Sequence, residues 1–303
     1  MPMHRERHNA LELGIRLTIK SPLLIKSGGI STNPSLPYMQ FVRTFVNGAE
    51  SIYVPGSSLK GIFRSYVEKV LRTKKGHEGA CDIVEKEKSC NKRLEEIEKT
   101  LKDKEGRDIK SEEIYKESCR TCKIFGNTRL KSRASITDAY PSGEIKTETR
   151  HGVAISRLTH AVAQGPFDME VAVSGTLCSK IYLENFEMWQ LGTVALAIKG
   201  LNDGLIRIGF GKNRGFGEVA VDVETVQFTL ASDVPPAEIW GVGKSVSKEI
   251  MNNYGFVSSD AIIIKAKPDK IDDDIIYRIR KYSSDSWDEI SSESLSKLKG
   301  ILS

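Results

Sequence analysis

The chain has 303 residues, 39% of them hydrophobic and 28% charged, which is enough apolar material for a packed core and excludes wholesale disorder. No apolar run approaches the ~18–20 residues of a membrane-spanning helix, and the N-terminal MPMHRERHNA lacks the apolar stretch of a secretion signal. We therefore expect a cytoplasmic protein with no membrane partner, built as one elaborated domain or two.

The formal net charge of +5 is unevenly distributed. Residues 233–303 carry a net −2, so the rest of the chain carries +7. Basic residues outnumber acids in three segments, 56–75, 119–133 and 207–217. Any one cluster is equally well explained as solvated charge, but three clusters interleaved with glycines and aromatics favour a polyanionic partner.

The first half of the chain contains a strand, a helix and a charged insertion. Residues 11–19 alternate apolar and polar side chains, which predicts a strand, and 51–55 predict a second. Apolar residues at helical spacing predict an amphipathic helix over 58–72, capped by Ser57 or Ser58. The insertion at about 76–122 is rich in charges of both signs and is predicted to be helical and exposed.

The remaining elements complete an α+β pattern. Strands are predicted over 134–140, 169–178, 205–208 and 217–223, and an apolar helix over 188–199. The order β-α-(insertion)-β-β-α-β predicts a ferredoxin-like core of the kind found in RNA-recognition (RRM-like) modules. We expect this core to span 1–231, followed by a small, mainly helical C-terminal appendage over 232–303.

Four of the five cysteines fall within 42 residues, and their spacing suggests a metal site. Cys119 and Cys122 have the separation that lets two thiolates share one tetrahedral Zn²⁺ ion, and no thioredoxin-like context favours a redox pair instead. Cys81 and Cys90 are more loosely spaced, so His77 is an alternative for one of them. We expect a structural Zn²⁺ at the base of the insertion, and a core position for Cys178.

A glycine-rich loop covers residues 209–217, GFGKNRGFG. Glycines let backbone amides approach phosphate groups, and Lys212 and Arg214 add positive charge. The loop lies between two predicted strands, so it is not a dinucleotide-binding fingerprint, and it lacks the Gly-Lys-Ser/Thr ending of a Walker loop. A glycine hairpin with no ligand is an equally good interpretation of the spacing alone.

Two segments together resemble a known family. PGSSLKGIFRS (55–65) and GFGKNRGFGEV (209–219) resemble the paired signatures of the RAMP superfamily, the repeat-associated proteins of CRISPR–Cas systems. TIKSPLLIKSGG (18–29), CRTCKIFGNT (119–128) and ASITDAY (134–140) follow the family's order. The resemblance covers roughly residues 11–230 and is greatest to backbone-type subunits of type III effector complexes, which often carry a zinc-bound insertion.

The resemblance implies an RNA-binding role. Such subunits bind the CRISPR RNA backbone, and their partners are complementary target RNA and the other RAMP and large subunits of the ribonucleoprotein. A hairpin "thumb", here about 141–167, displaces bases of the guide–target duplex, so that base pairing reads the sequence. The residues that would contact RNA are Ser57, Ser58, Lys60, Arg64, Arg157, His160, Gly209, Gly211, Lys212, Arg214, Gly215 and Gly217.

The same resemblance bears on cleavage. In RAMP subunits that cut target RNA, an acidic residue after the first Gly-Gly loop works with a divalent ion. Ser31 stands at that place, and a hydroxyl cannot replace a carboxylate, so we expect no cleavage there. Asp138, the other carboxylate in a motif, is expected to be structural.

Two other roles remain open from the sequence. One is a capping subunit of the same complex. The other is a metal-independent endoribonuclease that processes CRISPR RNA, in which His151 or His160 would act as the general acid–base.

In addition, residues 239–250 resemble a helix-hairpin-helix element, whose turn offers backbone amides to a phosphate. We favour the interpretation that this segment is a small helical module that packs against a neighbouring subunit.

Overall fold

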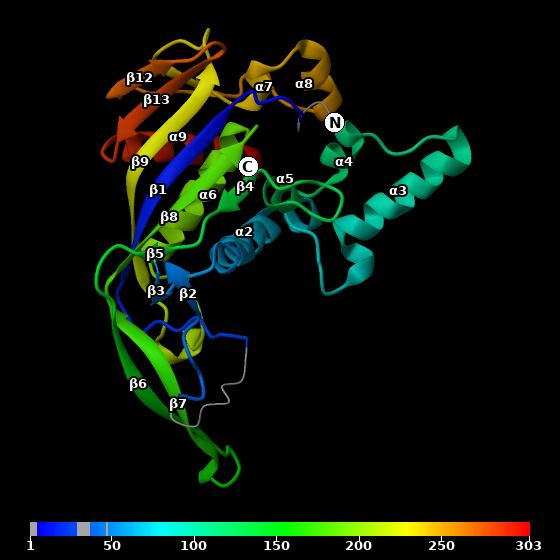
Figure 1. The fold of residues 1–303 in the computed structure, drawn as a ribbon. Coiled ribbons are helices and arrows are strands. Elements are labelled where there is room, and N and C mark those ends of the chain that lie inside the picture. Colours follow the sequence, from blue (N-terminus) through cyan, green and yellow to red (C-terminus); the bar gives the residue numbers. More distant parts are fainter. Residues whose placement is uncertain (1–4, 29–36, 47) are drawn as a thin grey trace.

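The computed structural model describes residues 5–28, 37–46 and 48–303, and it has an α+β fold whose strands pair antiparallel (Figure 1). A seven-stranded sheet of order β12-β13-β9-β1-β8-β4, with β5 also on β8, forms the centre. Its strands are β1 (Ala10–Ile19), β4 (Ala134–Ile136), β5 (Tyr140–Pro141), β8 (Thr176–Glu184), β9 (Val219–Ala231), β12 (Lys270–Asp273) and β13 (Tyr277–Ser283).

Smaller strand pairs and the helices surround this sheet. The pairs are β2 (Arg43–Val46) with β3 (Ala49–Ile52), β6 (Lys146–Ile155) with β7 (Val162–Ser174), and β10 (Glu238–Trp240) with β11 (Ala261–Ile263). The helices are α2 (Gly56–Gly79), α3 (Cys90–Glu105), α4 (Ser111–Glu117), α5 (Arg120–Phe125), α6 (Met188–Asn202), α7 (Val242–Ser245), α8 (Lys248–Tyr254) and α9 (Ser286–Leu302), with 3₁₀ turns η1 (Lys86–Lys88) and η2 (Lys212–Arg214). No helix in this described part is both long and apolar enough to cross a membrane.

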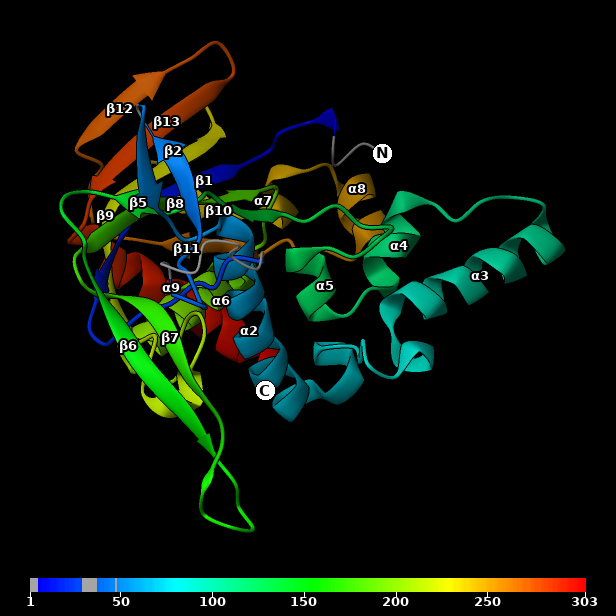
Figure 2. The ribbon, with the colours of Figure 1, turned by 60° about the horizontal axis from the view of Figure 1, so that its bottom comes forward.

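The central strand β1 buries one face and leaves the other open. Its buried side chains alternate with exposed or half-buried ones, as the sequence pattern predicts, and they are Leu11, Leu13, Ile15, Leu17 and Ile19. Helices α2, α6 and α9 lie on the buried side (Figures 1 and 2).

Helix α6 is buried on nearly all sides. It lies between the sheet and α9, and the two helices approach so closely that a β-carbon on Gly192 would lie 2.2 Å from the carbonyl oxygen of Ser294. The sequence of α6 has no polar face, and such a helix needs cover on both sides. Helix α9 supplies the second cover.

Three predicted strands differ from the structure. The one expected over 134–140 is interrupted after Ile136 and forms β4 and β5. The strand expected over 169–178 is two strands, β7 and β8, separated at Gly175, whose φ of 127° is unfavourable for residues with a side chain. Residues 205–208 form no strand, because the chain bends through the glycine-rich loop from there on. The long polar segment is the β6–β7 hairpin, which projects from the body (Figure 1).

The C-terminal residues are not a mainly helical appendage attached to a finished core. Strand β13 pairs with β9 and brings β12 into the central sheet, while α9 covers α6. The sequence hides this role because Arg278, Arg280 and Lys281 make β13 look like an exposed segment. The division at residue 232 therefore does not separate two independent layers of structure.

A fully buried arginine ties this segment together. The guanidinium of Arg280 donates to the carbonyls of Val234, Pro236 and Glu238, the last at 2.7 Å. No acidic side chain lies within 4.0 Å of Arg280 in the described chain, so backbone carbonyls take the place of a counter-ion. Residues 234–238, which follow β9, are thus fastened to β13.

We predict that Arg280→Met lowers the free energy of unfolding by about 3 kcal/mol, because each buried carbonyl left without a donor costs about 1–3 kcal/mol. Lys281→Met, on the exposed face of the same strand, is the matched control and should change stability by less than about 0.5 kcal/mol. Urea unfolding of both variants measures this. Equal stabilities would contradict the anchoring role.

Candidate RNA-binding groove and metal centre

Helix α2 presents two different faces. Ser58, Ile62, Ser65 and Lys69 follow one another at spacings of three and four residues and share one face. Ser57, Lys60 and Arg64 lie on another. At the start of the helix the Gly56 amide donates to Asp138 Oδ1 at 2.7 Å, which gives that carboxylate the structural role predicted for it.

Two of the predicted RNA-binding residues are engaged inside the protein. The Lys60 ammonium donates to Ser132 Oγ at 2.8 Å, and the Arg64 guanidinium donates to Glu68 and to the carbonyl of Gly126. Burial, with the nearby charge of Arg64, lowers the pKa of Lys60. These two side chains fasten α2 to residues 126–132, which follow α5.

The glycine-rich loop is built on four left-handed residues. Gly209, Gly211, Gly215 and Gly217 have φ between 72° and 86°. A β-carbon at Gly217 would lie 1.9 Å from the carbonyl of Ile208, so that position admits only glycine. The loop is pinned to the segment after β1 by hydrogen bonds from the amides of residues 210 and 217 to the carbonyls of residues 24 and 22.

The loop also contacts the base of the β6–β7 hairpin. The Arg214 guanidinium lies 6.0 Å from the ring centre of Phe167, and that of Arg150 lies 5.7 Å from the ring centre of Phe216. Lys212 and Arg214 themselves are exposed. Phe216 is buried, so it packs within the protein.

Helix α2 and the loop line one hollow. A cavity of about 260 Å³ lies between the Ile62–Lys69 face of α2 and residues 204–207 with Lys212. Its cations are Lys69, Arg207 and Lys212. Of the residues expected to contact RNA, Lys212 lines this hollow, whereas Ser57, Lys60 and Arg64 do not. The α2 residues that line it include Ser65, Tyr66 and Lys69, which follow Ser58 at helical spacing.

The hairpin carries the other predicted residues. Arg157 and His160 lie in its terminal turn, where Leu158 is 91% exposed. His151 Nδ1 lies 2.6 Å from Asp168 Oδ1 on the opposite strand, and both side chains are largely solvent-exposed. The hairpin therefore presents an apolar apex with basic neighbours, well away from the central sheet (Figure 2).

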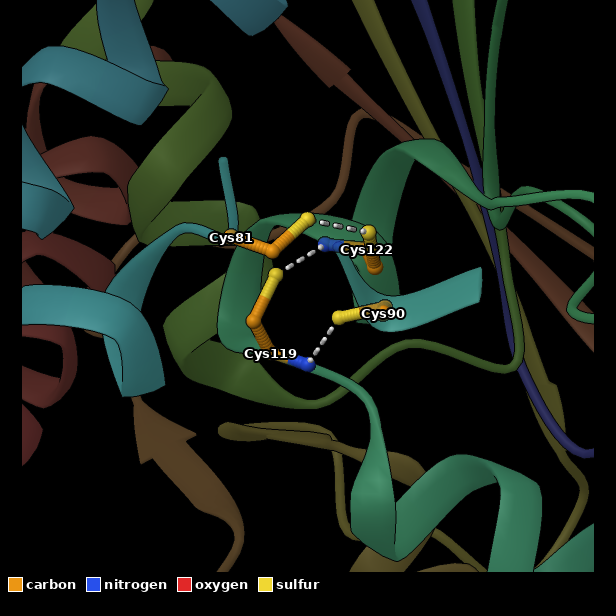
Figure 3. Close-up of side chains that lie close together, drawn as sticks. All are labelled: Cys81, Cys90, Cys119 and Cys122. Atoms are coloured by element: carbon orange, nitrogen blue, oxygen red, sulfur yellow. Dashed lines mark hydrogen bonds between the residues drawn. The ribbon is translucent and has the colours of Figure 1, made fainter. Parts of the chain in front are cut away.

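The four clustered cysteines converge into one buried group (Figure 3). Cys81 follows α2, Cys90 begins α3, and Cys119 and Cys122 begin α5. Their sulfur atoms all lie within 4.8 Å of one another. His77 does not belong to this group, so the all-cysteine alternative is the one that the fold brings together.

The geometry suits a tetrahedrally coordinated ion. Cys81 Sγ and Cys122 Sγ lie 3.7 Å apart, and metal–sulfur bonds of about 2.3 Å in a tetrahedron place the sulfurs about 3.8 Å apart. Hydrogen bonds among the four thiols lower the pKa of Cys81 and Cys119 and raise the pKa of Cys90 and Cys122, so the sulfur atoms share protons within one group. Four buried cysteines so placed could hold one metal ion.

In the segment that resembles a helix-hairpin-helix turn, a side chain of the protein already accepts a hydrogen bond from the backbone amide of Gly243. The amide of Gly243 donates to Asp260 Oδ2 at 3.0 Å, and Asp260 Oδ1 accepts from the amide of Met188. A carboxylate thus fills the place that a phosphate would take. Helices α7 and α8 pack against the insertion through Tyr115, Tyr254 and Phe256, which supports the packing interpretation.

Comparison with protein families identifies the chain. A sequence model of the RAMP superfamily matches residues 16–220, about two thirds of the chain. The chain belongs to the RAMP superfamily. The matched range holds the α2 face, the hairpin, the cysteine centre and the glycine-rich loop. No curated protein matches the sequence significantly. RAMP membership is consistent with a CRISPR-associated, RNA-binding protein.

The prediction about cleavage concerns Ser31. Ser31 falls within 29–36, outside the residues that the structure describes. The absence of cleavage by this RAMP protein therefore stays a prediction from the sequence.

Cys178, expected in the core, is only half-buried, because it points to the open face of the sheet.

We predict about one metal ion per chain by elemental analysis of the purified protein. Cys122→Ala should lose the ion and lower the free energy of unfolding by more than about 2 kcal/mol, because metal binding is coupled to folding. Cys178→Ala, which removes a thiol outside the cluster, is the control and should keep the ion. Retention of the ion in Cys122→Ala would argue against the centre.

Proposed function

We propose that this RAMP protein is a backbone-type subunit of a type III CRISPR–Cas effector complex. Its core is inferred to be ferredoxin-like, since the antiparallel order β9-β1-β8-β4, with α2 and α6 as the connecting helices, matches that fold. The observation that carries the functional proposal is the hollow shared by α2 and the glycine-rich loop, because two separate basic segments face one surface there.

In this proposal the guide RNA backbone runs along that hollow. Lys69, Arg207 and Lys212 would neutralise phosphates, and Ser58 and Ser65 offer hydroxyls to phosphate or 2′-hydroxyl groups. Arg207 lies 3.5 Å from Glu218, a weak pair that a phosphate can replace. Lys60 and Arg64 act behind the surface, holding α2 in place.

The β6–β7 hairpin would act as the thumb. An exposed apolar side chain at the apex, Leu158, is of the kind that proteins insert between base steps, and Arg157 beside it can contact the backbone. The hairpin would displace bases of the duplex between guide and target RNA. Sequence would be read by base pairing, with the protein recognising shape and charge.

The ion in the cysteine centre is proposed to be Zn²⁺, which four thiolates in tetrahedral geometry favour. Bound there, it would join the ends of α2, α3 and α5 and so hold the charged insertion in a fixed orientation. Such a structural ion has no open coordination position for a substrate. The proposed partners of the assembled protein are the other RAMP subunits and the large subunit.

The processing nuclease is the competing role. The pair His151–Asp168 has the geometry that orients an imidazole for proton transfer. It stands, however, on an exposed hairpin surface, separate from the hollow. A capping subunit would share all the binding features, and it differs only in its position within the complex.

Lys69→Gln combined with Lys212→Gln is expected to weaken single-stranded RNA binding about tenfold or more at low salt. The log–log salt slope should become shallower by about 1.4, because each phosphate contact contributes about 0.7. Lys104→Gln, on the exposed side of α3, is the control. Fluorescence anisotropy across a salt series measures both; an unchanged slope in the double variant would refute the groove.

The assembled complex with Mg²⁺ and target RNA should show no cut that maps to this subunit. Ser31→Asp should create such cuts, because a carboxylate can hold the ion that a hydroxyl cannot. His151→Ala should leave CRISPR RNA processing unaffected. Cuts by the unaltered subunit, mapped by sequencing gels, would show that it is catalytic.

A further inference from the structure

A second basic hollow lies at the opposite end of the sheet. A cavity of about 320 Å³ is lined by Arg5, Arg7, Lys131, Arg133, Glu6 and Glu184, with Ser132 and Asn185. It sits where β1 begins and β8 ends, since Ala10 pairs with Glu184. The glycine-rich loop leads into β9, whose Val219 pairs with Ile19 at the other end of β1.

The two hollows are therefore separate sites. The two hollows have no lining residue in common. Neither the thumb nor the glycine-rich loop contributes a residue to the second hollow. The charges of the second hollow come from residues that the groove does not use.

Positive charge in this hollow exceeds negative charge. Of the two acids, Glu184 pairs with Arg7 at 2.8 Å and reaches Lys131 at 4.0 Å, while Glu6 lies 3.3 Å from His8. Within the described chain no carboxylate lies within 4.0 Å of the Arg5 or Arg133 guanidinium. Arg5 and Arg133 thus form no ion pair within this hollow.

Arg133 makes the site more than a patch of surface charge, because only 7% of it is exposed. Its guanidinium lies 4.4 Å from the ring centre of Tyr115 and donates to Gln190 Oε1 at 3.3 Å. These contacts hold the group without supplying a full negative charge. Glu187, in the same buried network, accepts the Tyr115 hydroxyl instead.

A further cation stands behind the wall of the hollow. The Ser132 hydroxyl, which lines it, accepts from the Lys60 ammonium at 2.8 Å. A concave site lined by one sign of charge concentrates its field and attracts counter-ions. Arginine forks suit the oxygens of a phosphate group.

We propose that this hollow is a phosphate-binding site, at which Arg5, Lys131 and Arg133 take a phosphate group that is either part of an RNA backbone or a small free phosphate compound. Because the hollow and the groove have different lining residues, a single RNA molecule in contact with both would be held at two points on one subunit. The proposal assigns a role to the basic segment 119–133 that the groove leaves unused.

The test uses the full chain and two exposed substitutions, Arg5→Gln and Lys131→Gln, which spare the buried Arg133. Unlabelled inorganic pyrophosphate is titrated at low salt, and its stabilising shift of the unfolding temperature is measured. In parallel, the salt slope of single-stranded RNA binding is recorded. Lys104→Gln is again the control, and Lys69→Gln/Lys212→Gln reports on the groove independently.

Loss of the pyrophosphate shift, with an RNA salt slope shallower by about 1.4, would support an RNA phosphate as the ligand. Loss of the shift with an unchanged RNA slope would support a small phosphate compound. If Arg5→Gln/Lys131→Gln matches the unaltered protein in both the pyrophosphate shift and the RNA salt slope, the phosphate site is refuted. If Arg5→Gln/Lys131→Gln weakens phosphate binding but Lys69→Gln/Lys212→Gln leaves RNA binding unchanged, the proposed groove is refuted and this phosphate site is supported.

Discussion

The pairing of β1 with β8 on one edge and with β9 on the other is the interaction on which both basic hollows depend. One alternating set of β1 side chains is buried under α2, α6 and α9, so a shift of one residue in register would move that set to the open face. The same register places Glu184 at one end of β1 and Val219 at the other. The second hollow lies at the first of these ends, and the glycine-rich loop enters β9 at the other.

Packing around α6 explains why the C-terminal residues are part of the sheet layer. Helix α6 has no polar face, and α9 packs closely against it. Strand β13 must then lie beside β9 for the chain to reach α9, and Arg280 fastens the preceding turn to that strand. The acidic C-terminal segment and the basic core are consequently one packed unit, although their charges differ in sign.

The cysteine centre shows what spacing can and cannot predict. Cys119 and Cys122 lie in one helical turn, so their convergence follows from local geometry. Cys81 and Cys90 join them only because α2 ends and α3 begins beside α5, a contact between segments far apart in sequence. In the same way, spacing along α2 separates its faces, but only the neighbouring loop of residues 126–132 decides that Lys60 and Arg64 turn inward.

The sequence by itself determined the α+β class, the buried face of β1, the amphipathic α2, the left-handed glycines of the loop and the membership of the RAMP superfamily. These features depend on local periodicity and on backbone angles that individual residues prefer or forbid. Tertiary structure alone decided which face of α2 meets the glycine-rich loop, where Arg280 is buried, and that Arg5 and Arg133 share a hollow. Those outcomes depend on contacts between segments that are distant in the sequence. The sequence alone does not distinguish an arginine exposed to water from one that, like Arg280, is buried against backbone carbonyls.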